Sequence, residues 1–122
     1  MRFAWLADDG WSLDTATSII VTDAVFSVDG DLAPLAELHA LACEHGAMLI
    51  VDEAHSLGVI GDHGQGAAAA AGISGEANVV LTLTLSKSLG SQGGAVVADP
   101  SIIELLTSAA RTFIFDTALA PA

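Results

Sequence analysis

The sequence predicts an α/β fold in which a mostly parallel sheet ends in one antiparallel strand, residues 94–98. Hydrophobic residues make up 52% of the chain, which favours strands that are buried on both faces, as in a parallel sheet. Apolar runs with strand composition alternate with a stretch of helical spacing. No linker or charge block divides the 122 residues, so one domain is expected.

The first predicted unit is a strand, a helix and a second strand. Residues 18–22 form a β-branched run, and a turn built on an Asp-Gly pair follows. Pro34 then stands at a plausible first position of a helix, and apolar residues recur at helical spacing over 35–45. Residues 47–51 form the next strand. This order predicts a parallel pair of strands with a right-handed crossover.

The second half of the chain predicts two more strands. An alanine tract at 67–71, which could form a short helix, precedes a third strand at 79–83. A fourth strand at 94–98 follows after only a few residues. A parallel connection needs a dozen residues or more, so this strand should run antiparallel to its neighbour. A helix is expected from Asp99-Pro100 to Ala109.

Charge and composition argue against several functions. The 15 acidic and 3 basic residues give a net charge of −12, which disfavours binding to nucleic acid or to an anionic membrane. The apolar runs are shorter than the ~18 residues of a membrane span, and the N-terminus turns acidic too early for a signal peptide. Cys43 is the only cysteine, so neither an internal disulfide nor a cysteine metal cluster is expected. The chain is predicted to be cytoplasmic, with no metal.

Polar residues follow three of the predicted strands at the point where each strand ends. They are Asp23 with Ser27, Asp52 with His55, and Thr84 with Lys87. In open α/β sheets, ligands bind beyond the carboxyl ends of the strands. These side chains therefore form the candidate site.

Lys87 is the strongest candidate for a catalytic residue because it is the only lysine and lies at a strand-to-loop junction. In a poorly solvated pocket an amine loses its proton more easily and can form an imine with an aldehyde. A carboxylate at the buried edge of the sheet, such as Asp52, would keep a pyridine nitrogen protonated, and His55 could donate to a phenolic oxygen. The Thr84 hydroxyl suits a phosphate. The pattern predicts a site for pyridoxal phosphate; a surface lysine, a capping aspartate and a structural histidine are the ordinary alternatives.

The segment Asp52-Glu53-Ala54-His55 also matches the second nucleotide motif of DEAH-type helicases. That function requires an upstream glycine-rich loop that ends in Gly-Lys-Ser/Thr. No lysine precedes Lys87, which argues against a helicase.

Three segments in order, 21–35, 51–55 and 84–90, resemble the α-oxoamine synthases, a family of fold-type I pyridoxal-phosphate enzymes. The resemblance implies that residues 18–122 are a three-layer fragment of the large α/β domain of such a transferase, and it leaves residues 1–17 unassigned. The family's upstream cofactor loop, its ring-stacking histidine and its C-terminal domain have no counterpart here. The 122 residues alone are therefore expected to be inactive.

The resemblance also implies an activity and residue roles. The family joins an amino acid to an acyl thioester with loss of carbon dioxide, and these small-molecule substrates are expected to be L-alanine and a pimeloyl-type thioester in biotin biosynthesis. Lys87 would hold the internal aldimine and act as a base, and Asp52 would pair with the pyridine nitrogen. His55 and Ser27 would contact the ring oxygen region, and Thr84 the phosphate. The full-length enzyme would be a homodimer. The alternatives are a relative resembling glycine C-acetyltransferase or 5-aminolevulinate synthase, and a non-catalytic remnant.

Overall fold

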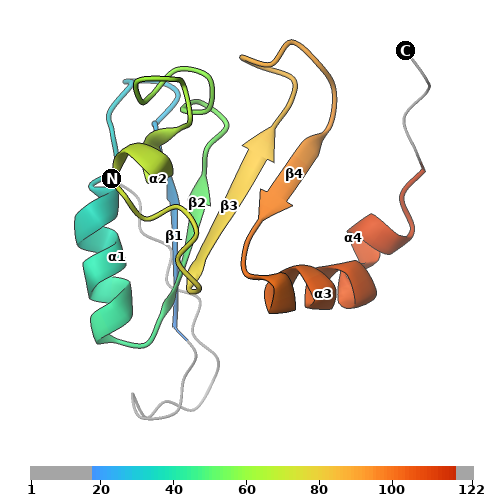
Figure 1. The fold of residues 1–122 in the computed structure, drawn as a ribbon. Coiled ribbons are helices and arrows are strands. Elements are labelled where there is room, and N and C mark those ends of the chain that lie inside the picture. The colour runs from blue at the N-terminus through green and yellow to red at the C-terminus, as the bar shows by residue number, and fades with distance from the viewer. Residues whose placement is uncertain (1–17, 118–122) are drawn as a thin grey trace.

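The computed structural model describes residues 18–117, and these form one sheet with flanking helices (Figure 1). The strands are β1 (Ile19–Asp23), β2 (Met48–Asp52), β3 (Val79–Thr84) and β4 (Gly94–Val97). The helices are α1 (Leu35–Glu44), α2 (Ala67–Ala70), α3 (Pro100–Ala109) and α4 (Arg111–Ile114). In the sheet order β1-β2-β3-β4, the first three strands are parallel and β4 is antiparallel to β3. The predicted α/β architecture is confirmed, including the antiparallel fourth strand; what was expected of residues 1–17 and 118–122 lies outside the described residues.

Helix α1 begins and ends at backbone signals in the sequence. Pro34 has φ −77° and ψ 71°, which is not helical, so the proline precedes the helix by one residue instead of opening it as predicted. At the other end Gly46 has φ +59°, a left-handed conformation that glycine adopts without steric cost. This turn returns the chain into β2, parallel to β1.

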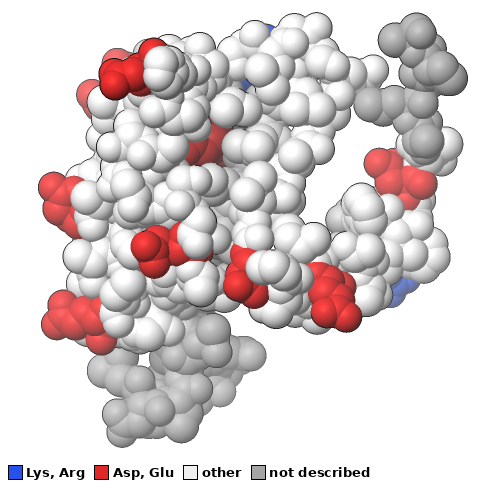
Figure 2. All heavy atoms as spheres, in the orientation of Figure 1, with Lys and Arg blue, Asp and Glu red and all other residues white. Residues whose placement is uncertain are grey.

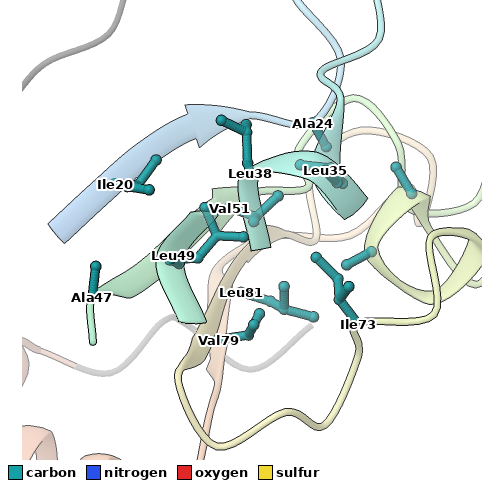
Figure 3. Close-up of a cluster of buried hydrophobic side chains, with 13 residues drawn as sticks. Ile20, Ala24, Leu35, Leu38, Ala47, Leu49, Val51, Ile73, Val79 and Leu81 are labelled. Carbon is teal, nitrogen blue, oxygen red and sulfur yellow. The ribbon is translucent and has the colours of Figure 1, made fainter. Parts of the chain in front are cut away.

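The core lies between the sheet and the helices α1 and α2 (Figure 3). Successive side chains of a strand point to opposite faces of the sheet. Along β2, Leu49 and Val51 are accordingly fully buried, whereas Asp52 is exposed. Leu35 and Leu38 of α1 join the same cluster. The unit β1-α1-β2 is therefore the closely packed half of the described chain.

The C-terminal elements are more open. All four residues of β4 are exposed, and α3 and α4 contain no buried residue. With β3 and β4, these two helices line a groove of about 530 Å³. Figure 2 shows it as a hollow between the body of the molecule and the C-terminal helices, with acidic side chains scattered over the face in view.

The loops after β1, β2 and β3 gather at one edge of the sheet, where the three parallel strands end (Figure 1). The strand register pairs Asp23 with Asp52, and Asp52 with Thr82. Parallel strands in this register bring polar groups from distant parts of the sequence to the same edge, which is where open α/β sheets bind ligands.

Candidate active site

Lys87 and His55 form a direct contact between two of the predicted site residues. Lys87 Nζ lies 2.8 Å from His55 Nε2, although the two residues belong to loops that follow different strands. An ammonium at Lys87 would donate to Nε2, whereas a neutral amine could accept a hydrogen bond from Nε2–H, so the pair can share one proton. The structure brings these residues together, and their catalytic roles stay a prediction.

Asp52 is the last residue of β2. Its Oδ1 accepts a hydrogen bond from Ala54 N at 2.8 Å, which fixes the carboxylate at the start of the following turn. Asp52 and Lys87 are both exposed. The sequence predicts a buried edge of the sheet for the aspartate and a poorly solvated pocket for the lysine. For residues 18–117 that expectation is wrong, because none of them covers this edge of the sheet.

Thr84 ends β3 and forms a pair with Ser86. Their hydroxyl oxygens lie 2.8 Å apart, and Ser86 N also donates to Thr84 Oγ1 at 3.3 Å. Ser27 lies in the loop after β1, on an exposed turn closed by a hydrogen bond from Phe26 N to Asp31 O of 2.9 Å. Within the described residues the Ser27 hydroxyl forms no hydrogen bond with Lys87 or His55. Thr84 and Ser27 therefore remain predicted site residues that lie outside the contact pair.

A second contact joins the loops that carry the pair. Ser88 Oγ donates to Leu57 O, so the residues that follow Lys87 and His55 are tied together. Gly58 has φ +80°, and a Cβ at this position would lie 2.6 Å from Ser88 Oγ. Glycine at 58 thus permits both the backbone conformation and the close approach of the two loops.

Sequence reasoning missed Glu53, which lies in the sequence between the predicted residues Asp52 and His55. Its side chain is 2% exposed, and its carboxylate accepts hydrogen bonds from Ala67 N and Ala68 N at the start of α2. The hydroxyl of Ser56 donates to the same carboxylate. The alternation of β2 could have identified this residue: since Val51 faces the core and Asp52 faces away, the next side chain points inward again.

The functional groups at this site suit an aldehyde cofactor with a pyridine ring and a phosphate. They comprise the Lys87 amine, the Asp52 carboxylate, the His55 imidazole, and the hydroxyls of Thr84 and Ser86, all at or just beyond strand ends. Residues 18–117 contain no group of three or more His, Cys, Asp or Glu side chains that could hold a metal ion. Among the helices in this range, none has the length and apolar character that crossing a bilayer requires.

A family model described as aminotransferase class I and II matches residues 9–122. The chain belongs to this family. The match begins within the segment that the sequence analysis left unassigned, and it covers all the described residues. The family membership agrees with the α/β sheet and with the place of the candidate site at its carboxyl edge.

Curated relatives and solved structures give a finer relationship. The chain is 57% identical to an 8-amino-7-oxononanoate synthase of Mycolicibacterium gilvum (strain PYR-GCK) over 109 residues, which are 89% of this chain and 29% of that protein. The synthase of Mycolicibacterium smegmatis is 56% identical over 105 residues, 86% of this chain and 28% of the relative. The chain therefore spans less than a third of the length of these relatives.

The structural neighbours belong to the same group of enzymes. A serine palmitoyltransferase of Sphingomonas wittichii matches with a TM-score of 0.78 and 39% identity, over 89% of this chain and 27% of that one. An 8-amino-7-oxononanoate synthase from Francisella tularensis matches with a TM-score of 0.69 and 37% identity, over 87% and 30%. The relationship to the α-oxoamine synthases, predicted from three short segments, is confirmed.

Proposed function

We propose that this chain carries part of the active site of a pyridoxal-phosphate enzyme that condenses L-alanine with a pimeloyl thioester, with loss of carbon dioxide, in biotin biosynthesis. The observation that carries the proposal is the 2.8 Å contact between Lys87 Nζ and His55 Nε2. The only lysine of the chain lies beside an imidazole, at the end of the sheet where open α/β folds generally bind ligands.

Each residue of the site has a distinct task in this proposal. Pyridoxal phosphate, when bound, would supply an electron sink. Lys87 would hold its aldehyde through Nζ and move the α-proton of the substrate, while His55 would control the proton on Nζ. Asp52 Oδ1 is held by Ala54 N, and the carboxylate would keep the pyridine nitrogen protonated. The Thr84 hydroxyl would bind the phosphate, and His55 and Ser27 would contact the ring oxygen region.

The names and identities of the relatives support the biotin-type substrates. The curated relatives named 8-amino-7-oxononanoate synthase are 54% to 57% identical to this chain, and a solved structure with that name is 37% identical. We also propose, from the resemblance to the family, that the full-length enzyme is a cytoplasmic homodimer that acts on small molecules.

An absorption spectrum with pyridoxal phosphate tests the cofactor assignment. We expect a yellow imine band that Lys87→Ala abolishes and that the control Arg111→Ala, on α4, retains. A folded chain without this band would contradict the proposal and favour a non-catalytic remnant. Adding amino acids to the loaded chain then tests the substrate. L-alanine should change the band most, and a larger response to glycine would favour the glycine C-acetyltransferase or 5-aminolevulinate synthase alternative.

A further inference from the structure

We propose that Glu53 is a positioning residue for the Lys87–His55 pair. Its buried carboxylate would fix the loop of residues 53–66, and with it the ring of His55, in the place where Nε2 meets Lys87 Nζ. The link to catalysis rests on the proposed function, whereas the positioning itself concerns only residues that the structure describes.

The first support is the way Glu53 is held from both sides. Its backbone N donates to Thr82 O of β3 at 2.9 Å, so its main chain is hydrogen-bonded to the sheet just beyond the end of β2. Its Oε2 accepts from Ala67 N at 3.0 Å and its Oε1 from Ala68 N at 2.7 Å. Glu53 thereby connects the end of the sheet to the first turn of α2, with the whole loop between them.

The second support is the position of His55 inside a turn that Glu53 closes. The Glu53 carbonyl accepts hydrogen bonds from Ser56 N at 3.1 Å and from Leu57 N at 3.0 Å. The hydroxyl of Ser56, the residue after His55, donates to the Glu53 carboxylate. The backbone on both sides of the imidazole is therefore attached to one residue, and movement of that residue would change where the imidazole points.

The third support is the energetic cost of burying the Glu53 carboxylate, which an apolar side chain at this position would not have. A charge removed from water is destabilising unless hydrogen bonds satisfy it. Glu53 is 2% exposed and has three donors, an arrangement that specifies one geometry. Glycine at position 66 permits this arrangement. Gly66 has φ +98° and lies so close to the carboxylate that a Cβ would be 2.5 Å from Glu53 Oε2.

The fourth support is that the loop of residues 53–66 contacts the loop that carries Lys87. Lys87 Nζ contacts His55 Nε2, and Ser88 Oγ donates to Leu57 O. His55 and Leu57 both lie within four residues of Glu53 in sequence. A displacement of Glu53 would therefore disturb both contacts that hold Lys87 beside the imidazole.

The test compares Glu53→Gln with a matched control, Asp99→Asn. Asp99 also caps a helix and accepts hydrogen bonds from a serine, Ser101, but no predicted site residue lies on α3. The first readout is the pH titration of the His55 ring by NMR in the chain without cofactor. The second is the rate at which Lys87 is covalently labelled by pyridoxal phosphate and borohydride.

We expect Glu53→Gln to shift the His55 titration and to slow Lys87 labelling on the order of 10-fold or more, by analogy with the loss of residues that orient metal-binding side chains. Asp99→Asn should change neither readout. Gly66→Ala, whose methyl group would clash with the same carboxylate, should change both readouts in the same way as Glu53→Gln. A folded Glu53→Gln chain with the wild-type titration and labelling rate would overturn the proposal.

A milder variant covers the case in which Glu53→Gln does not fold. Ser56→Ala removes one donor to the carboxylate and should shift both readouts in the same direction by a smaller amount; unchanged readouts would overturn the proposal. The two hypotheses fail separately. If the wild-type chain forms no adduct with pyridoxal phosphate, the proposed function fails, and the His55 titration still decides the role of Glu53.

Discussion

The two loops that meet at the candidate site are built differently. The loop of residues 53–66 starts at the buried Glu53 and includes buried Ser56 and Gly66, so side-chain and backbone bonds attach it to the core. The loop of residues 85–93 is exposed from Ser86 onward, and backbone hydrogen bonds close it, such as Leu85 N to Gly93 O at 3.0 Å. The imidazole thus lies on an anchored loop, while the amine lies on an open one that is aligned by contact with the first.

This difference suits the proposed chemistry. A loop with few buried contacts opens locally at low free energy, and a lysine that holds a cofactor and later moves a proton must change partners. An imidazole that controls that proton must instead keep its place, since small displacements of reacting groups cost large factors in rate. The comparison predicts that disturbing the anchored loop affects both loops, whereas disturbing the open one has local effects.

The largest effect is expected in the buried strand that precedes the anchored loop. Leu49 is fully buried in β2, the strand that leads into residues 53–66, and Leu49→Ala should destabilise the fold by about 2–5 kcal/mol through lost burial and a cavity. Val97 in β4 is 48% exposed, and Val97→Ala should cost roughly 0.5 kcal/mol or less. Urea unfolding of both variants measures the difference, and similar losses would contradict the contrast between the two halves.

A smaller effect is expected where the loops touch. Gly58→Ala places a methyl group 2.6 Å from Ser88 at φ +80°, and should cost roughly 1–3 kcal/mol and weaken the loop contact. Gly90→Ala is the matched control, because Gly90 has φ +60° and no atom within 4 Å of its Cβ position. The variant Gly90→Ala therefore introduces backbone strain without a steric clash. If the two variants unfold at the same denaturant concentration, the loop contact contributes nothing.

The smallest effect concerns Asp99, the exposed counterpart of the buried carboxylate. Hydrogen bonds from the Ser101 hydroxyl and backbone N–H lower the pKa of Asp99 below its ordinary value. A lowered folded-state pKa means that the cap stabilises α3 above the unfolded pKa of about 3.9 and loses this effect as pH falls through the folded value. NMR titration should show this pKa rising in Ser101→Ala. An unchanged titration would show that the serine is not the cause.

Most of the fold could be predicted from the sequence because its signals are local. β-branched runs indicated the strands, and the short segment between residues 84 and 94 required β4 to be antiparallel, as it is. The position of Pro34 was wrong by one residue, because the sequence does not show whether a proline has helical ψ. The edge of the sheet as the candidate site followed from the parallel order alone.

The details of the site depend on contacts that no local pattern contains. Glu53 binds backbone groups 14 and 15 residues away, and only the folded path of a glycine-rich loop brings them near. The exposure of Asp52 and Lys87 depends on what covers the strand ends, which the motifs do not encode. Sequence therefore predicted which groups the site offers, and the structure was needed to show how one loop holds them.

Covalent labelling with an internal reference tests the central claim most directly, namely that Lys87 and His55 act as one site. The chain is treated with pyridoxal phosphate and borohydride, and the labelled amines are mapped by mass spectrometry. The only lysine and the Met1 amine compete for the reagent. The account predicts that Lys87 is labelled faster than Met1, and that His55→Ala slows labelling at Lys87 but not at Met1. Equal rates at the two amines, unchanged in His55→Ala, would contradict it.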